Sequence, residues 1–446
     1  MKTLYTNGTF LTMDPESRIL SGGAMVVEDS LILALDREDV LRREHPEAEV
    51  RDLKGRLVLP GLINSHIHLA QSLFRGMTDD MTIEPWLFQR IWPLQAAHDT
   101  ETFLAGARLA MLEMMLTGTT TFVESMIIHY GLAELLQEVE TSGMRARLAR
   151  VVMEPREGSL LPARLTESFE TGLEEALRVR KLVKDPLRTD IWLGPRWTGM
   201  YNPLLLKKTV EAMDSYGLRA TMHYAESPED VDAIRQDTGL SPMQFAQDMG
   251  LTDREMLLIH CTYLDPEDPR RLGGHKASLA HCPSSSMKMA FGYADVPVLL
   301  ETHTPVGLGT DAAACNNGND LFTEIRGTAL LHKFRAQDPE VLPARQVLRM
   351  ATSLGARAIF EPDHLGRLMP GFRADFITVD PAWAAPLPEG SWESALVYSL
   401  SGRDVRDVYV DGRQLVREGE SLIYDQEKVR SDARRALELL RQRTGL

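Results

Sequence analysis

The chain has 446 residues, of which 43% are hydrophobic and 25% are charged, and it carries a formal net charge of −15. This composition is typical of globular proteins and excludes fibrous and disordered classes, and the acidic balance without a basic cluster argues against a nucleic-acid partner. The apolar stretches are too short to span a bilayer, so we predict no membrane association.

The N-terminus and the cysteines both indicate a reducing compartment. The opening MKTLYTNGTFLTMD lacks the charged region followed by an apolar segment that export requires. Cys261, Cys282 and Cys315 are odd in number and none belongs to a CxxC pair, so we interpret them as small buried residues. We therefore predict a cytoplasmic protein.

Residues 1–56 have the pattern of a small β-domain. Short alternating apolar runs are separated there by Asn-Gly and Gly-Gly, which are turn signals between antiparallel strands. We expect these runs to pair with a second segment farther along the chain.

Between residues 57 and 366, helix-length segments alternate with short apolar runs, which is the pattern of βα units around a parallel sheet. Residues 100–118 are one such helix and Gly118 ends it. Eight runs can be counted, the number that closes a (β/α)8 TIM-type barrel. The runs are RLVLPGLINSH, TTTFVES, ARLARVVM, DIWLGP, RATMHYAE, EMLLIHC, ASLAHC and PVGLGTD.

The β-pattern of the N-terminus returns in residues 367–424, with an Asp-Gly turn signal. We predict that residues 1–56 and 367–424 form one composite β-sandwich domain beside the barrel. Residues 425–446 are predicted to form a terminal helix. The expected fold is thus α/β, a barrel with a small domain built from both chain ends.

Polar side chains gather at the ends of the eight runs, which is where barrels of this kind place their active sites. His66 and His68 end the first run, and residues i and i+2 of a strand point the same way, so both can offer an imidazole nitrogen to one ion. His223 and Asp311 complete a set of four ligands. The other strand-end candidates are Glu124, Glu226, His260 and His281.

A lone HxH pair is weak evidence for a metal site, because two core histidines can have the same spacing. The core interpretation loses weight here, since burying several unpartnered polar groups at one end of a sheet costs kilocalories for each. We therefore favour the metal centre.

Five segments, in this order, carry a resemblance: PGLINSHIH, HYAES, LIHC, LAHCPSSSMKM and GLGTDAAACNNGNDLFTEIR. They resemble the amidohydrolase superfamily, in the branch of methylthioadenosine and S-adenosylhomocysteine deaminases, guanine deaminases and s-triazine hydrolases. FRGMTDDMTIEPWLFQRIWP looks like the loop and helix after the first strand of the methylthioadenosine-type enzymes. The resemblance covers nearly the whole chain. It implies one divalent ion held by His66, His68, His223 and Asp311, zinc in the first place and iron as the alternative.

One ion is expected because two-metal members use a carboxylated lysine at the end of the fourth strand, where this chain reads WLGPRWTG. A metal-bound water has a lowered pKa and would supply hydroxide as the nucleophile. Asp311, as ligand and base, and His260 would take up its proton and orient the attack.

Two further residues have predicted catalytic roles with open alternatives. Glu226 would protonate the ring nitrogen beside the attacked carbon and later the leaving group, or else be a solvated carboxylate at the start of a helix. His281 would position the intermediate, or else be a polar cap on the seventh strand.

The substrate contacts depart from the nucleoside-type pattern. Those enzymes have an acidic residue two positions after WP and a histidine after the GP of the fourth strand, where this chain has Gln95 and Arg196. Gln71 and Arg196 resemble guanine deaminases, and both can hold an exocyclic oxo group. Arg196 could equally hold a carboxylate or pair with Glu124.

Other pocket candidates lie in loops or on a strand rim. Trp86, Trp92, Trp197 and Met200 could stack on a flat ring, with lid packing as an equal alternative. Arg150 matches an arginine with which nucleoside deaminases contact substrate, and a salt bridge on the rim is its competing interpretation.

These observations predict a mononuclear metal-dependent aminohydrolase that releases ammonia from an amino-substituted purine, pterin or triazine. The alternatives are another leaving group, such as chloride from a chlorotriazine or an amine from an amide or urea, and a non-catalytic barrel. The predicted partners are a small heterocyclic substrate and further copies of the chain in a homo-oligomer.

Overall fold

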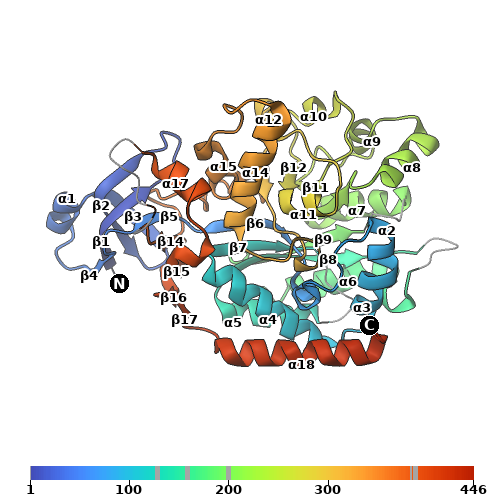
Figure 1. Ribbon diagram of the computed structural model, residues 1–446, viewed down its shortest axis with the longest axis horizontal. Coiled ribbons are helices and arrows are strands. Elements are labelled where there is room, and N and C mark those ends of the chain that lie inside the picture. Colours follow the sequence, from blue (N-terminus) through green and yellow to red (C-terminus); the bar gives the residue numbers. More distant parts are fainter. Residues whose placement is uncertain (1, 126–130, 156–160, 197–201, 382–383, 385–389) are drawn as a thin grey trace.

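The structure is a computed structural model that describes residues 2–446 except 126–130, 156–160, 197–201, 382–383 and 385–389. A barrel with surrounding helices forms its centre, and a separate sheet made from both chain ends lies at one side (Figure 1). This confirms the predicted fold class. Among the described residues, no helix is both long and apolar enough to cross a membrane.

Eight parallel strands close the barrel, in the spatial order β10-β11-β12-β13-β6-β7-β8-β9. Each corresponds to one of the eight runs expected from the sequence. The strands are β6 (Leu62–Ile67), β7 (Thr119–Glu124), β8 (Arg145–Val152), β9 (Thr189–Pro195), β10 (Ala220–Tyr224), β11 (Met256–His260), β12 (Ser278–His281) and β13 (Val306–Leu308).

The composite domain is one nine-stranded sheet, ordered β17-β16-β15-β14-β5-β1-β2-β3 with β4 beside β1. A core of Tyr5, Phe376 and Tyr409 rings packs on one of its faces. Its strands are β1 (Lys2–Leu11), β2 (Ile19–Glu28), β3 (Leu31–Arg37), β4 (Glu49–Asp52), β5 (Leu57–Pro60), β14 (Phe376–Val379), β15 (Val405–Val410), β16 (Arg413–Arg417) and β17 (Glu420–Ser421).

The first predicted run divides between the two domains. Its beginning, β5, pairs with β1 and β14 in the composite sheet, whereas its end, β6, enters the barrel. Gly61 lies at the break, and a Cβ atom there would come within 2.2 Å of the Thr120 hydroxyl oxygen. Pro60 and the close packing at Gly61 therefore end one strand and start the next without a linker.

Helices cover the outside of the barrel (Figure 1). The chain contains α1 (Glu38–Glu44), η1 (Leu69–Phe74), α2 (Ile83–Pro85), η2 (Trp86–Ile91), α3 (Trp92–Ala96), α4 (Thr100–Leu116), α5 (Leu132–Ser142), η3 (Ala163–Leu165), α6 (Phe169–Arg180), α7 (Pro203–Tyr216), α8 (Pro228–Thr238), α9 (Pro242–Asp248), α10 (Asp268–Arg271), α11 (Pro283–Lys288), α12 (Val296–Glu301), α13 (Ala313–Asn316), α14 (Leu321–Ala336), α15 (Ala344–Met350), α16 (Ser353–Ala358), α17 (Trp392–Tyr398), η4 (Gly402–Asp404) and α18 (Gln426–Thr444).

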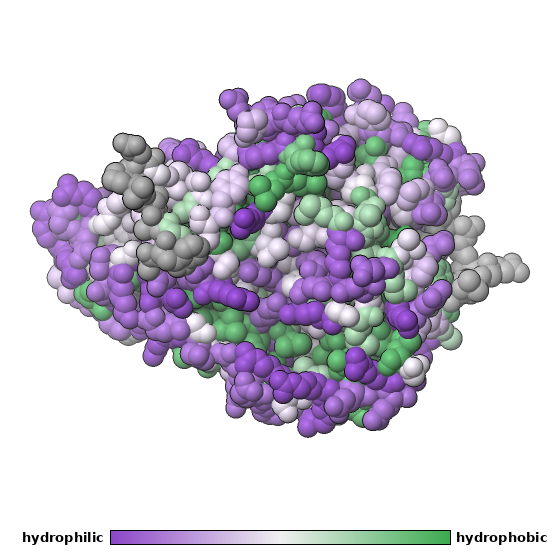
Figure 2. Space-filling model, in the orientation of Figure 1, coloured by the Kyte–Doolittle hydropathy of each residue, from purple (hydrophilic) through white to green (hydrophobic). Residues whose placement is uncertain are grey.

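The two helices expected from sequence are present as α4 and α18. A capping box of Asp99 and Thr102 begins α4. The terminal helix α18 buries Val429, Ala433, Ala436 and Leu440, spaced at helical intervals, and packs along α4. Its outward face is hydrophilic (Figure 2).

A cluster of buried and partly buried ions joins the barrel to the composite sheet. The Arg145 guanidinium, at the N-terminal end of β8, donates to both carboxylate oxygens of Asp375, at 2.5 and 3.1 Å, and also to Asp411. Arg188 and Arg373 donate to Asp411 as well. Burial opposes the charge of Arg145, but the two carboxylates hold its pKa above the usual value. Each charge in this cluster thus has an opposite charge beside it.

Candidate active site

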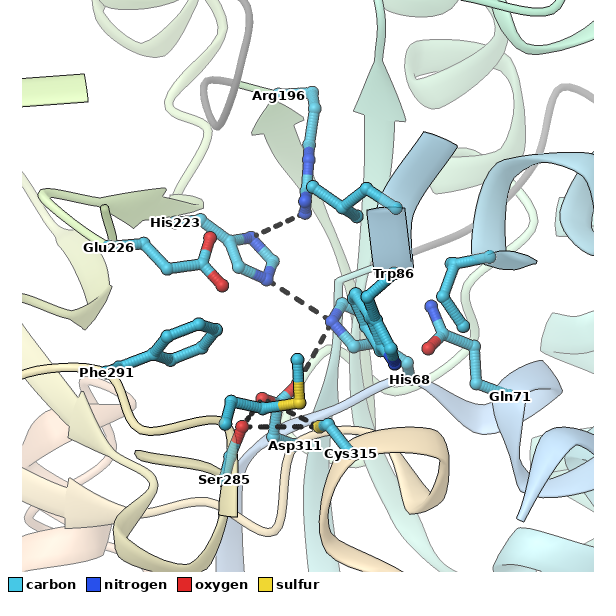
Figure 3. Close-up of a pocket in the computed structure, with 13 residues that line it drawn as sticks. His68, Gln71, Trp86, Arg196, His223, Glu226, Ser285, Phe291, Asp311 and Cys315 are labelled. Atoms are coloured by element: carbon cyan, nitrogen blue, oxygen red, sulfur yellow. Dashed lines mark hydrogen bonds and ion pairs between the residues drawn. The ribbon is translucent and has the colours of Figure 1, made fainter. Parts of the chain in front are cut away.

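The four predicted ligands meet at the C-terminal end of the barrel. His66 lies in β6, His68 directly follows it, His223 lies in β10 and Asp311 follows β13. One ligand atom from each residue lies within 4.8 Å of all the others, and all four side chains are buried. His68 Nε2 is 3.2 Å from His223 Nε2 and 3.3 Å from Asp311 Oδ1 (Figure 3). This arrangement could hold one metal ion.

An irregularity in β6 turns the first two ligands inward. Ile63 packs in the barrel interior whereas Ile67 packs against the outer helices, so the simple alternation of faces breaks between them. The pairing of β6 with β7 shifts register between Asn64 and Ile67. Such irregularities re-aim side chains beside active sites, and here the shift directs both His66 and His68 to the centre.

The protonation states suit a cation. Burial lowers the pKa of His66 to about 4 and also lowers the pKa values of His68 and His223, so the three rings are neutral at physiological pH. Burial alone would raise the pKa of Asp311, but hydrogen bonds with His66 and His68 bring it well below its usual range. Neutral imidazoles and an ionised carboxylate are the forms that bind a divalent metal.

The ligand atoms of the four side chains are suited to a zinc ion. The Ser125 hydroxyl lies 2.9 Å from His66 Nδ1, so Nδ1 can carry the ring proton and Nε2 is left as the electron-pair donor. His68 Nε2 lies 3.2 Å from His223 Nε2 and 3.3 Å from Asp311 Oδ1. Imidazole nitrogens together with a carboxylate oxygen are donors that zinc takes in proteins, so the residues fit a bound zinc ion.

Backbone strain accompanies the site. His260 and Asp311 have φ angles of 70° and 57°, in the left-handed region that non-glycine residues rarely adopt. Strain of this kind persists where surrounding structure enforces it and is common at active sites. Here it aims both side chains at the metal position.

Glu226 and His260 lie beside the four ligands. Glu226 follows β10 and precedes the N-cap of α8, and it lines the pocket. His260 Nε2 is 3.5 Å from Glu226 Oε1 and 3.9 Å from Asp311 Oδ2. Neither ring nitrogen of His260 has a hydrogen-bond partner among the described residues, and burial lowers its pKa. The ring is therefore neutral and can accept a proton.

Arg196 reaches the pocket from the end of β9. Its Nη1 lies 3.1 Å from His223 Nδ1, and its Nε makes no hydrogen bond within the described part of the chain. The side chain is 5% exposed. A buried guanidinium with an unused donor at a pocket wall is suited to bind an oxygen acceptor.

The pocket combines this polar floor with flat and apolar walls. Trp86, Leu87 and Ile91 come from the η2 segment, and Phe291 faces them from the other side (Figure 3). Gln71 also lines the pocket, and its amide oxygen has no partner among the described residues. Flat walls and unused polar atoms are suited to an aromatic ring with polar substituents.

The structure places two predicted site residues outside this pocket, which corrects both expectations. His281 Nε2 lies 3.4 Å from His332 Nε2 on α14, and Arg150 pairs with Glu167 and Glu175. Successive residues of a strand point to opposite faces, and their neighbours Ala280 and Ala149 occupy the barrel interior. The side chains of His281 and Arg150 therefore point away from the site.

The remaining candidates are distributed as follows. Glu124 is buried and accepts a hydrogen bond from the Leu69 amide, 2.7 Å away. Gln95 and Trp92 are buried without lining the pocket, although Gln95 continues the face of Leu87 and Ile91. Trp197 and Met200 lie outside the described residues.

Two residues that sequence reasoning missed contact Asp311. The Ser285 hydroxyl and the Cys315 thiol both lie near Asp311 Oδ2, and all three cysteines are buried and free. Cys315 lies four residues after Asp311, and Ser285 follows the seventh predicted strand in HCPSSSMKM. These positions were the available signal, but a cysteine without a partner motif is indistinguishable from a packing residue.

Comparison with known proteins provides independent information. The model of the amidohydrolase family matches residues 57–415. A 5-methylthioadenosine/S-adenosylhomocysteine deaminase from Bacillus cytotoxicus is 33% identical over 439 residues, 98% of each chain. A 5′-deoxyadenosine deaminase from Methanosarcina acetivorans is 36% identical, again over 98% of each chain.

A solved structure is similar over the same extent. It is an adenosine deaminase from Xanthomonas campestris with bound zinc, 27% identical, with a TM-score of 0.91 over 99% of this chain and 98% of the other. The similarity includes both the barrel and the composite sheet.

Proposed function

The chain belongs to the amidohydrolase family, and from this premise we propose that it is a zinc-dependent deaminase of amino-substituted aromatic N-heterocycles. The observation that carries the proposal is the convergence of His66, His68, His223 and Asp311 with Glu226 in one pocket. A binding protein derived from this fold would have no need to keep all of these groups together.

His66, His68, His223 and Asp311 would hold the ion, which when bound lowers the pKa of water and so provides a nucleophile near neutral pH. His260, with both ring nitrogens unused among the described residues, accepts the proton that this activation releases. Asp311, the carboxylate ligand beside His260, shares that role.

Glu226 donates protons to the substrate. Its carboxyl group protonates the ring nitrogen next to the amino-bearing carbon, which makes that carbon electron-poor. Glu226 then takes up the proton that His260 accepted and passes it to the departing amine, which leaves as ammonia. Its position 3.5 Å from His260 Nε2 allows one proton to be passed between the two side chains.

The substrate class is a flat ring that carries an oxygen acceptor besides its amino group. The ring would lie against Trp86 and Phe291, and the acceptor would face Arg196 and the Gln71 amide. Purines and pterins with an oxo group meet this description. Gln95 remains a predicted contact for a larger substituent, on the face that Leu87 and Ile91 continue.

Ammonia release from a panel of adenosine analogues, guanine, 8-oxoguanine, pterins and s-triazines tests the proposal, with protein of measured zinc content. We expect release from at least one amino-oxo heterocycle. Cleavage of a chlorotriazine or a phenylurea without ammonia release from any panel member would reject deamination.

A variant of Arg196 tests the substrate class separately. Arg196→Ala should raise KM for oxo-substituted rings by about tenfold or more while the zinc content stays unchanged. Arg254→Ala removes a partly exposed guanidinium that pairs with Asp214 and serves as the control. An unchanged KM for Arg196→Ala would contradict the contact.

A cytoplasmic location and a homo-oligomeric state remain predictions. Fractionation of the source cells tests the first, and sedimentation of the purified chain tests the second.

A further inference from the structure

The carboxylate of Asp311 uses its two oxygens for different purposes. Oδ1 faces the metal position, 3.2 Å from His66 Nε2 and 3.3 Å from His68 Nε2. Oδ2 lies 2.6 Å from the Ser285 hydroxyl, 3.2 Å from the Cys315 sulfur and 3.9 Å from His260 Nε2 (Figure 3). One oxygen is thus free for a ligand while the other is bound by protein donors.

We propose that Ser285 and Cys315 are positioning residues that together fix the Asp311 carboxylate and so present its Oδ1 to the metal. The inference rests on the proposed function, in which Asp311 is a ligand. Both residues also line the pocket, but in this role they act through Asp311.

The donor directions support this pairing. An ionised carboxylate can only accept, so the Ser285 hydroxyl donates to Oδ2, and 2.6 Å is the length of a charge-assisted hydrogen bond. The Cys315 thiol is a weaker donor, and Asp311 Oδ2 at 3.2 Å and the Ala312 carbonyl at 3.1 Å share its single hydrogen. Ser285 should therefore contribute the larger share.

The two donors come from different elements that are joined behind them. Ser285 belongs to α11 and Cys315 to α13, and both side chains are buried. The Glu324 carboxyl accepts from the Ser284 amide at 3.0 Å and lies 3.5 Å from the Asn316 side-chain nitrogen. One side chain on α14 thus holds the immediate neighbours of both donors.

The backbone of Asp311 leaves its carboxylate one rotational freedom that these donors can restrict. Its left-handed φ of 57° fixes where the side chain starts, but the carboxylate can still rotate about its last torsion. Two donors converging on Oδ2 remove that freedom. Groups that orient metal ligands in this way typically contribute 10- to 100-fold to metal affinity or activity.

Zinc affinity, measured by competition with a chromogenic chelator, tests the proposal without any substrate. Ser285→Ala should bind zinc about 10- to 100-fold more weakly. Cys315→Ala should bind it a few-fold more weakly, and Cys315→Ser should restore the affinity or exceed it, because a hydroxyl is the stronger donor. The cobalt-substituted variants should show shifted d–d absorption bands in the same order.

Ser286→Ala is the matched control. Ser286 is the next residue of the same serine run, is also buried, and its hydroxyl has no hydrogen-bond partner in the described part of the chain. Its replacement should leave zinc affinity and the cobalt spectrum unchanged. Ser285→Cys keeps a donor and should lie between wild type and Ser285→Ala, and it replaces that variant if Ser285→Ala does not fold.

Wild-type affinity in Ser285→Ala or Ser285→Cys, or a Cys315→Ser variant as weak as Cys315→Ala, would overturn the positioning role. His66→Ala separates this result from a failure of the proposed function. If His66→Ala loses zinc while the Ser285 variants keep it, the metal site stands and the positioning role is rejected. If wild type binds no zinc, both are rejected.

Discussion

At the N-terminal end of the barrel strands the buried charge of Arg145 is matched with opposite charges, whereas at the C-terminal end polar atoms of His260 and Arg196 have no hydrogen-bond partners among the described residues. Arg145 is enclosed by Asp375 and Asp411 at the first end. At the other end, both nitrogens of His260 and the Nε of Arg196 have no hydrogen-bond partner among the described residues. Buried polar groups therefore serve two purposes in this fold. The matched charges hold the two domains together, whereas the unmatched atoms at the site are available to a ligand.

The largest expected effect comes from removing a ligand at the unmatched end. Asp311→Ala leaves three imidazoles without a carboxylate, so bound zinc and turnover should both fall below detection. Metal analysis and an ammonia assay check this result. Chelator treatment of wild type should have the same effect on turnover, and added zinc should reverse it. Retention of a full equivalent of zinc in Asp311→Ala would contradict the ligand assignment.

Glu226→Gln should separate metal binding from chemistry. The amide has nearly the same shape but cannot deliver a proton, so turnover should fall by about 10²- to 10⁴-fold while zinc content stays at the wild-type level. Steady-state kinetics and metal analysis on the same sample measure both quantities. Loss of zinc in this variant would place Glu226 among the ligands instead.

A substitution at the N-terminal end of the barrel strands should lower the stability of the protein and leave its metal binding unchanged. Arg145→Met leaves Asp375 without its guanidinium partner in a buried site, which should lower the free energy of unfolding by about 3–5 kcal/mol. Denaturant unfolding measures it, with Lys184→Ala as the control because its ion pair with Glu140 is exposed and should contribute under about 1 kcal/mol. Zinc affinity of the folded Arg145→Met protein should remain unchanged, and a large decrease would show that the two ends are coupled.

The last expected effect develops gradually with pH and concerns Glu324, which lies between the helices behind the site. Burial raises its pKa from 4.5 to about 8, so the folded protein holds a proton that the unfolded chain releases at lower pH. The stability contributed by this group is therefore complete below about pH 4.5 and is lost as the pH rises towards 8. Over that window wild type should lose roughly 1 kcal/mol per pH unit relative to Glu324→Gln.

Thermal unfolding of the two proteins from pH 5 to 9 measures this difference. Exposed Glu340→Gln is the control and should follow wild type throughout. Parallel pH curves for wild type and Glu324→Gln would show that the Glu324 carboxyl is ionised in the folded state.

The sequence was sufficient to predict the barrel and the composite domain, because strand count and turn signals are local patterns. It also identified the four converging side chains, since parallel strands bring their ends together. It failed to predict the direction in which two side chains point. His281 and Arg150 end strands as His223 does, but each directly follows a residue that faces the barrel interior, Ala280 or Ala149, and so points outward. The alternation of inward and outward side chains in those two strands could have been predicted from the sequence, whereas the register shift in β6 could not.

Ser285 and Cys315 were missed for another reason. Their contacts with Asp311 depend on how α11 and α13 are placed, and neither residue type has a strong local signature. Likewise, the pairing of Arg145 with two aspartates more than two hundred residues away follows from the packing of domains, which spacing along the chain does not encode.

The place of β5 in the composite sheet affects how the chain folds during synthesis. β5 ends at Pro60, but its neighbour β14 begins only at Phe376, so one edge of β5 stays unpaired while the whole barrel is made. At roughly 5–20 residues per second, this interval lasts tens of seconds. An open edge of apolar residues is a template for wrong pairing. Nascent chains of this protein should therefore aggregate through β5 unless chaperones cover that edge until Phe376–Val379 leaves the ribosome.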